Sequence, residues 1–308
     1  IRDRDVTGVQ TCALPISSTT QLVNAKTNDW DYDLIAKLGY PRDIFLPIEM
    51  PGTEVGHLSQ TIQDQVGFDC SVVLPATHDT GAAVMAVPSL SDDTLYISSG
   101  TWSLMGTELK TANCSPDSMA CNFTNEGGYD HRYRYLKNIM GLWMIQSVRK
   151  ELSPDEGFGS ICEHAATETI TSIVDANDDR FLAPQNMTAE VQAACRESGQ
   201  KVPEGIYQVA AVIYNSLAKC YADTVREIEK IEHVTYPCIN IVGGGANAAY
   251  LNELTAKATG KTVYAGPTEA TAIGNIMAQM IAAGELQDLA EARKCVFHSF
   301  EIKEEKGC

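Results

Sequence analysis

Apolar and polar positions follow two different periods along this chain. Short apolar runs predict strands at residues 70–74, 239–242 and 262–265. After Gly81 such runs alternate with segments of helical period, a pattern typical of a layered α/β domain. The fold class predicted from the pattern is therefore α/β.

Two longer segments carry apolar residues at helical spacing. The first predicts a helix over residues 136–148, which would also carry Asn138 and Gln146. The second predicts the longest helix of the chain, over residues 206–231. Its expected buried face comprises Ile206, Ala210, Ile213, Leu217, Cys220, Val225 and Ile228.

The most informative stretch covers residues 72–108. An apolar strand leads to Asp79, a small-residue helix follows, and a second strand ends in the turn 98–101, with sequence Ser-Ser-Gly-Thr. A carboxylate at the carboxyl end of a strand lies at the mouth of an α/β sheet, and such a turn suits phosphate. A carboxylate at Asp79 followed by a phosphate-binding turn at 98–101 indicates phosphoryl transfer. The structural alternative, in which Asp79 caps its helix and Gly100 sharpens a hairpin, stays open on spacing alone.

A glycine turn at residues 243–245 follows the predicted strand 239–242 and precedes a helix predicted over 246–258. Residues 243–248 also satisfy G-x-G-x-x-A, the dinucleotide fingerprint, which would make the protein an NAD-dependent oxidoreductase. Against this, the strand 262–265 ends without the acidic residue that holds a ribose, since Glu269 comes only after Pro267. The fingerprint alone is a weak signal.

Composition excludes several classes of function. With 44% hydrophobic residues among 308, the chain can form a sizeable core, and its net charge of −17 disfavours nucleic acid or an anionic membrane as partner. Ten cysteines and six histidines show no metal-ligand spacing, so no metal site is assigned and a cytoplasmic location is the default expectation. No run of eighteen apolar residues predicts a membrane span.

Five blocks of residues identify the chain as a member of the FGGY carbohydrate kinases. They are 72–108, 124–146, 193–197, 241–260 and 265–286. The resemblance implies an actin/hexokinase-like (ribonuclease-H-like) fold, in which two lobes close on Mg-ATP. It further implies that residues 17–80 are the C-terminal remnant of the first lobe and 81–308 the nucleotide-binding second lobe. The second lobe would be essentially complete and the first mostly missing.

Residues 1–16, IRDRDVTGVQTCALPI, resemble the translation of a sequencing adapter. A targeting peptide is the alternative, but the charged residues and short apolar run fit neither a signal nor a transit peptide. We therefore expect a non-native segment that packs on nothing.

The family resemblance also implies the site residues. Asp79 would be the general base that accepts the proton of a ketose primary hydroxyl. The substrate-binding residues would be His78, Asp79, Thr80 and Asn138. The residues in contact with ATP would be Thr101, Gln146 and Gly244. ATP and Mg²⁺ are the cofactors implied, and a small-molecule sugar is the substrate.

Three hypotheses follow. The first is a carbohydrate kinase present as a fragment, which we expect to be inactive alone. The second is the NAD-dependent oxidoreductase built on residues 243–248. The third is a non-catalytic, actin-like nucleotide-binding scaffold, which Asp79 beside His78 disfavours because a scaffold needs no base.

Overall fold

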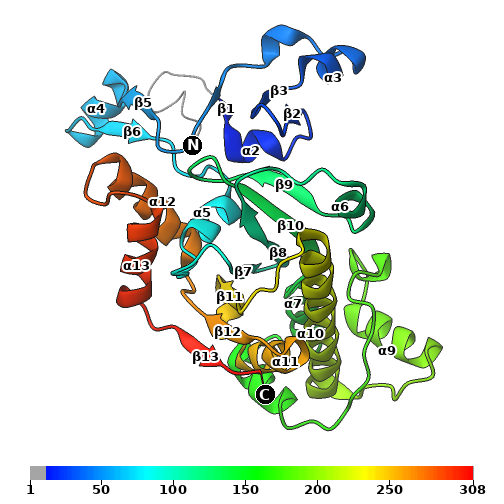
Figure 1. The fold of residues 1–308 in the computed structure, drawn as a ribbon. Helices are drawn as coiled ribbons and strands as arrows, with labels where there is room; N and C mark the ends of the chain where they lie inside the picture. Colours follow the sequence, from blue (N-terminus) through cyan, green and yellow to red (C-terminus); the bar gives the residue numbers. More distant parts are fainter. Residues whose placement is uncertain (1–11, 308) are drawn as a thin grey trace. The chain divides into compact units, whose positions relative to one another are not determined.

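The computed structural model describes residues 12–307, which form parts of two compact units. Unit 1 contains the chain up to Ala86 together with Glu108–Leu136 and Ala270–His298. Unit 2 contains Val87–Thr107, Lys137–Glu269 and the chain from Ser299 onward. Figure 1 shows the elements of both.

Unit 2 is built on parallel strands. Strand β11 (Cys238–Val242) pairs in parallel with β7 (Leu95–Ser99) and with β12 (Thr262–Ala265). On the outer sides, β8 (Trp102–Leu109) is antiparallel to β7, and β13 (Lys303–Glu305) is antiparallel to β12. The strands β7, β11 and β12 are largely buried, as expected of parallel strands covered on both faces.

Helices pack beside this sheet in unit 2. They are α7 (Trp143–Leu152), α8 (Phe158–Ala165), α9 (Met187–Glu197), α10 (Gly205–Glu232) and α11 (Ala249–Thr259), with short 3-10 helices at Asp179–Phe181 and Gly244–Asn247. Helix α10 packs against α7, α8 and α11 (Figure 1). It confirms the helix predicted over 206–231, and Ile213, Leu217 and Ile228 are buried on its inner face.

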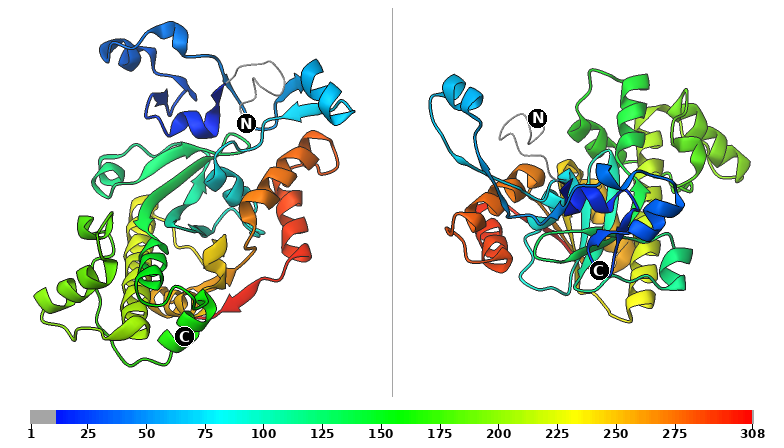
Figure 2. Two further views of the ribbon diagram at one scale, coloured as in Figure 1. Left: turned by 180° about the vertical axis from the view of Figure 1, so that it is seen from behind. Right: turned by 90° about the horizontal axis from the view of Figure 1, so that it is seen from above.

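In unit 1, the short helix α5 (Asp79–Met85) is packed against α12 (Ala270–Ala282) (Figure 2). The helices approach closely because Gly274 has no side chain, and a Cβ there would overlap the carbonyl oxygen of Ala82. Helix α13 (Leu289–Ser299) supplies the buried Arg293, which donates hydrogen bonds to the last carbonyl groups of α5.

The remaining elements of unit 1 are small. Strand β9 (Thr124–Gly127) is antiparallel to the first half of β10 (Tyr133–Met140). The others are β1 (Cys12–Ala13), α2 (Leu14–Ser18), β2 (Val23–Asn24), β3 (Asp29–Trp30), α3 (Tyr32–Lys37), the 3-10 helix Arg42–Ile44, β4 (Ile48–Glu49), β5 (Glu54–His57), α4 (Gln60–Val66), β6 (Ser71–Val73) and α6 (Pro116–Ala120). These compact units do not test the lobe boundary predicted at 80/81.

The helix predicted over residues 136–148 is wrong in its first part. Residues up to Met140 belong to strand β10, and the helix α7 begins at Trp143. Residues 133–136 are all buried, so this strand shows no alternation that would separate it from a helix. Asn138 therefore lies on a strand and Gln146 on a helix.

The expectation that residues 1–16 pack on nothing is also wrong where the structure describes them. Residues 1–11 lie outside the described part of the chain, but Leu14 is only 1% exposed. Its side chain fills the space left by Gly127, where an added Cβ would lie 2.8 Å from Leu14 Cγ. Gly127 N–H also donates to Ser18 Oγ at 2.8 Å, which holds α2 beside β9. The non-native origin of residues 1–16 stays a prediction.

Leu14→Ala should test this packing. Because Leu14 is buried, we expect its truncation to lower the free energy of unfolding by about 2–5 kcal/mol in a denaturant titration. Ile16→Ala is the matched control, since Ile16 is 46% exposed and its truncation should change stability by less than about 0.5 kcal/mol. Equal effects from the two variants would show that the segment does not pack on β9.

Candidate functional site

One group of predicted site residues lies in unit 2, at the carboxyl end of β7. Two backbone hydrogen bonds join the turn Gly100–Thr101 to the start of α7. Leu142 N–H donates to Gly100 O at 3.1 Å, and Trp143 N–H donates to Thr101 O at 3.0 Å. Gly141 allows this approach, because a Cβ there would lie 2.5 Å from the carbonyl carbon of Trp102. Gln146 stands one turn further along α7, and its N–H donates to Leu142 O at 2.8 Å.

The glycine turn after β11 packs on the same end of β7. A Cβ on Gly245 would overlap Ser99 Oγ, and one on Gly243 would lie 2.9 Å from Ser99 O. Gly243 also has φ +85°, a conformation that favours glycine. Gly244 differs from both, because it is exposed and nothing lies within 4 Å of where its Cβ would be.

The structure thus brings Thr101, Gln146 and Gly244 to one end of the parallel strands β7 and β11. Val242 is paired with Ser98, so the two turns leave the sheet at the same level. The exposed hydroxyl of Thr101 and the bare backbone at Gly244 present small polar groups with room for a ligand. These features fit a nucleotide.

The oxidoreductase hypothesis loses its main support here. Packing against Ser99 accounts for the glycines at 243 and 245 without any dinucleotide. Strand β12 continues into Gly266 and Pro267, and Pro267 O accepts a hydrogen bond from Gly243 N–H at 3.0 Å. No acidic residue stands at the end of β12, where the fingerprint requires one.

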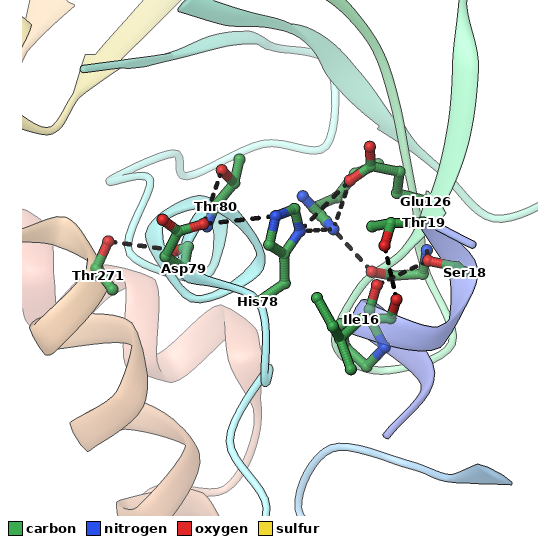
Figure 3. Close-up of polar contacts among 11 residues, drawn as sticks. Ile16, Ser18, Thr19, His78, Asp79, Thr80, Glu126 and Thr271 are labelled. Carbon is green, nitrogen blue, oxygen red and sulfur yellow. Dashed lines mark hydrogen bonds and ion pairs between the residues drawn. The ribbon is translucent and has the colours of Figure 1, made fainter. Parts of the chain in front are cut away.

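A second group lies in unit 1, around the start of α5 (Figure 3). Asp79 is the first residue of the helix and its side chain is 79% exposed. Its Oδ1 accepts from Thr80 N–H at 2.6 Å and lies 3.4 Å from Thr80 Oγ1 and 3.5 Å from His78 Nε2. Among the described residues, every contact of the Asp79 carboxylate is made by Oδ1. Oδ2 therefore faces outward and can accept a proton.

The helix-capping alternative for Asp79 does not fit this geometry. The N-cap position of α5 is His78, whose side chain makes no capping hydrogen bond. The Asp79 carboxylate accepts from the N–H and the hydroxyl of the adjacent Thr80, a residue that is 8% exposed, and not from the N–H groups two or three residues on that a cap would bond. The hydroxyl of Thr271 donates to the backbone oxygen of Asp79 at 3.2 Å and links α12 to this first turn (Figure 3).

Two residues that sequence reasoning missed lie behind His78. Arg134 on β10 and Glu126 on β9 are directly opposite each other in the antiparallel register, and Arg134 is 0% exposed. Arg134 Nη2 lies 2.8 Å from Glu126 Oε2 and 2.9 Å from His78 Nδ1. Counting outward from the turn between β9 and β10 would have paired Glu126 with Arg134, but the burial of this ion pair had no signal in the sequence.

Glu126 titrates below its ordinary range. Burial alone would raise its pKa, but the contacts with His78 and Arg134 outweigh burial, so the pKa lies below 4.5. The carboxylate of Glu126 is therefore ionised at neutral pH and is the counter-ion of the buried guanidinium.

The other predicted residue, Asn138, lies in the second half of β10 within unit 2 and is exposed. The described residues hold no group of three or more side chains arranged for a metal ion. None of their helices is both long and apolar enough to cross a membrane.

Comparison with known proteins defines the class. Residues 95–283 match the family model for the C-terminal domain of the FGGY family of carbohydrate kinases. The chain belongs to this family. It is 47% identical over 286 residues to rhamnulokinase of Oceanobacillus iheyensis and 43% identical over 300 residues to that of Bacillus subtilis. These alignments cover 93% and 97% of this chain, but only 61% and 62% of the two relatives.

Solved structures of sugar kinases share the fold at low sequence identity. Xylulose kinase from Lactobacillus acidophilus superposes with a TM-score of 0.74 at 15% identity, over 99% of this chain and 61% of that one. Glycerol kinase from Plasmodium falciparum superposes with a TM-score of 0.72 at 12% identity, over 99% of this chain and 61% of that one. The predicted kinase fold is thereby confirmed, and the chain spans about 61% of the length of these proteins.

Gly244→Ala should separate ligand binding from folding. The added methyl group meets no protein atom within 4 Å, so the free energy of unfolding should change by no more than about 1 kcal/mol. It occupies the space expected for the nucleotide, so the Kd for ADP should rise about tenfold or more in a calorimetric titration.

Gly159→Ala is the matched control, because its Cβ also meets nothing within 4 Å but lies on α8. It should leave the Kd unchanged. Gly245→Ala should instead destabilise the fold, because its Cβ would overlap Ser99. Unchanged affinity in Gly244→Ala would remove Gly244 from the nucleotide site.

Glu126→Gln should reveal the buried ion pair through the pH dependence of the free energy of unfolding. Because the pKa of Glu126 is lowered in the folded state, its stabilising effect is complete above about pH 4.5 and is lost as the pH falls through the lowered value. We expect the variant to unfold more easily than the parent by about 1–3 kcal/mol at neutral pH. That difference should shrink in more acidic buffer.

Urea titrations across the pH range measure this difference. The exposed Glu163 makes a suitable control, and Glu163→Gln should give a small difference at every pH. A gap between the parent and Glu126→Gln that stays constant down to strongly acidic pH would contradict the ion pair.

Proposed function

We propose that this chain supplies the nucleotide-binding part of an ATP-dependent sugar kinase that phosphorylates the primary hydroxyl of a ketose, L-rhamnulose. The rhamnulokinase relatives at 40–48% identity support this substrate. The observation that carries the proposal is the Asp79 carboxylate, which is 79% exposed at the start of α5 with Oδ1 held and Oδ2 facing outward.

The chemistry explains why a carboxylate is needed there. An alcohol is a poor nucleophile, so its attack on phosphorus is assisted by a group that orients the hydroxyl and accepts its proton. Asp79 is assigned this role, with Oδ2 as the acceptor atom. His78 and Thr80 stand on either side of it and are proposed to bind other hydroxyls of the sugar, together with Asn138.

Thr101, Gln146 and Gly244 are proposed to hold the nucleotide. ATP, when bound, supplies the phosphoryl group, and Mg²⁺ neutralises part of its charge. The Thr101 hydroxyl and Gln146 amide offer hydrogen bonds, while the bare backbone of Gly244 lets a planar ring approach closely. No residue of this chain is assigned to the metal.

We infer that residues 17–308 alone bind adenine nucleotide weakly and turn over no sugar. Phosphoryl transfer depends chiefly on positioning and charge stabilisation. The chain corresponds to 61% of its relatives' length, so the rest of such a protein would supply the remaining contacts. A cytoplasmic location also remains a proposal. The nine described cysteines that are free thiols fit a reducing compartment.

Asp79→Asn tests the catalytic assignment. The experiment uses this chain joined to the N-terminal part of a rhamnulokinase relative, which should phosphorylate L-rhamnulose with Mg-ATP. The amide keeps the shape of the carboxylate but cannot accept a proton, so kcat should fall by roughly 10²–10⁴ in a coupled assay. The Kd for ADP should stay within about twofold, because Asp79 is assigned to the sugar.

Asp155→Asn is the control, since Asp155 is an exposed aspartate of unit 2 outside the site, and it should retain parental kcat. Near-parental turnover by Asp79→Asn would refute its role as base. If the joined protein phosphorylates a different sugar but not L-rhamnulose, the substrate is wrong and the kinase activity stands.

A further inference from the structure

We propose that Arg134, with Glu126 as its counter-ion, is a positioning residue that fixes the tautomer of His78, so that its Nε2–H points at Asp79 and holds the carboxylate in place. The inference rests on the proposed function for its catalytic meaning. The tautomer itself does not depend on the proposed function, because it is a matter of which ring nitrogen of His78 carries the proton. Arg134, Glu126, His78 and Asp79 all lie in unit 1. Figure 3 shows His78 between Asp79 and Glu126.

The contact between Arg134 and His78 sets the tautomer. Arg134 Nη2 lies 2.9 Å from His78 Nδ1, within hydrogen-bond distance. A guanidinium has only donors, so Nδ1 must be the acceptor in this contact and carries no hydrogen. In a neutral ring the hydrogen is then on Nε2, the nitrogen that lies 3.5 Å from Asp79 Oδ1.

The competing arrangement has His78 donating from Nδ1 to Glu126. His78 Nδ1 lies 3.5 Å from Glu126 Oε2, which is longer than its contact with Arg134. The contact of Nδ1 with Arg134 has the geometry of a hydrogen bond, whereas its contact with Glu126 is an ion-pair distance only. One of the two Nη2 hydrogens of Arg134 is therefore directed at His78, while Glu126, 2.8 Å from Nη2, contributes its charge.

Burial makes this arrangement rigid. Arg134 is 0% exposed, and its Nε donates to Gly127 O at 3.2 Å, which fixes the plane of the guanidinium. The side chains of Arg134 and Glu126 leave the same face of the β9–β10 ladder, because the two residues are directly opposite in register. A buried guanidinium requires a counter-ion, and Glu126 supplies it.

The tautomer of His78 also affects the proposed base, Asp79. Asp79 Oδ1 accepts a hydrogen bond from Thr80 N–H, and His78 Nε2 lies 3.5 Å from the same oxygen, so Oδ2 is left for a substrate hydroxyl. Arg134 thus acts on Asp79 through His78, with no contact of its own with Asp79 among the described residues.

Long-range ¹H–¹⁵N NMR of the histidine rings measures the tautomer directly in the 308-residue chain. The His78 signals are assigned by their loss in His78→Gln. At neutral pH we expect the cross-peak pattern of a neutral ring protonated on Nε2. Either the Nδ1–H tautomer or a doubly protonated ring in the parent chain would overturn the proposal.

Arg134→Met removes the donor at similar volume, and His78 should then turn to Glu126 and carry a proton on Nδ1. Arg134→Lys keeps a donor and should restore the Nε2–H pattern. If Arg134→Met does not fold, Glu126→Gln decides. It leaves Arg134 in place and should keep the Nε2–H tautomer, and a switch to Nδ1–H there would overturn the proposal.

Kinetics in the joined protein test the catalytic meaning separately. Arg134→Met should lower kcat by roughly 10-fold, less than Asp79→Asn, with an unchanged KM for ATP and recovery in Arg134→Lys. An unchanged kcat together with a switched tautomer would overturn the positioning role. If Asp79→Asn is fully active, the proposed function fails, while the NMR result still decides the tautomer.

Discussion

The site in unit 2 depends on backbone segments that pack with no side chain between them. Gly141 lies against the backbone at Trp102, and Gly243 and Gly245 lie against Ser99. These contacts bring the turns after β7 and β11 and the start of α7 together at one end of the parallel strands. Packing requires glycine at positions 243 and 245. Of the three glycines in this turn, Gly244 alone has open space where a Cβ would lie. Packing therefore does not account for the glycine at position 244, which we propose lies against the nucleotide.

A second constraint governs the proposed base in unit 1. Helix α5 has seven residues, too few to be stable on its own. Buried arginines hold both of its ends: Arg134 through His78 at the start, and Arg293 at the last carbonyl groups. Each arginine has a carboxylate counter-ion, since Arg293 lies 2.6 Å from Glu108 Oε2. Asp79 thus stands on a short helix whose position is set by charged groups behind it.

Much of this could be predicted from the sequence. Strand 262–265, the long helix α10 and the turns at 98–101 and 243–245 follow from local signals. The boundary between β10 and α7 could not be predicted, because the buried first half of β10 lacks the alternation that separates a strand from a helix. Arg134 and Glu126 were missed because burial of an ion pair depends on what packs above the hairpin. The packing of Leu14 was missed for the same reason, since the space at Gly127 exists only after folding.

Hydrogen–deuterium exchange of the 308-residue chain, with and without excess Mg-ADP, tests the central claim that the turns after β7 and β11 and the start of α7 form the nucleotide site. We predict slower exchange in peptides covering residues 98–103, 141–147 and 243–248, with no change at 54–73, where β5 and β6 lie. Absence of protection in those three segments at any nucleotide concentration, or protection confined to 54–73, would contradict the account.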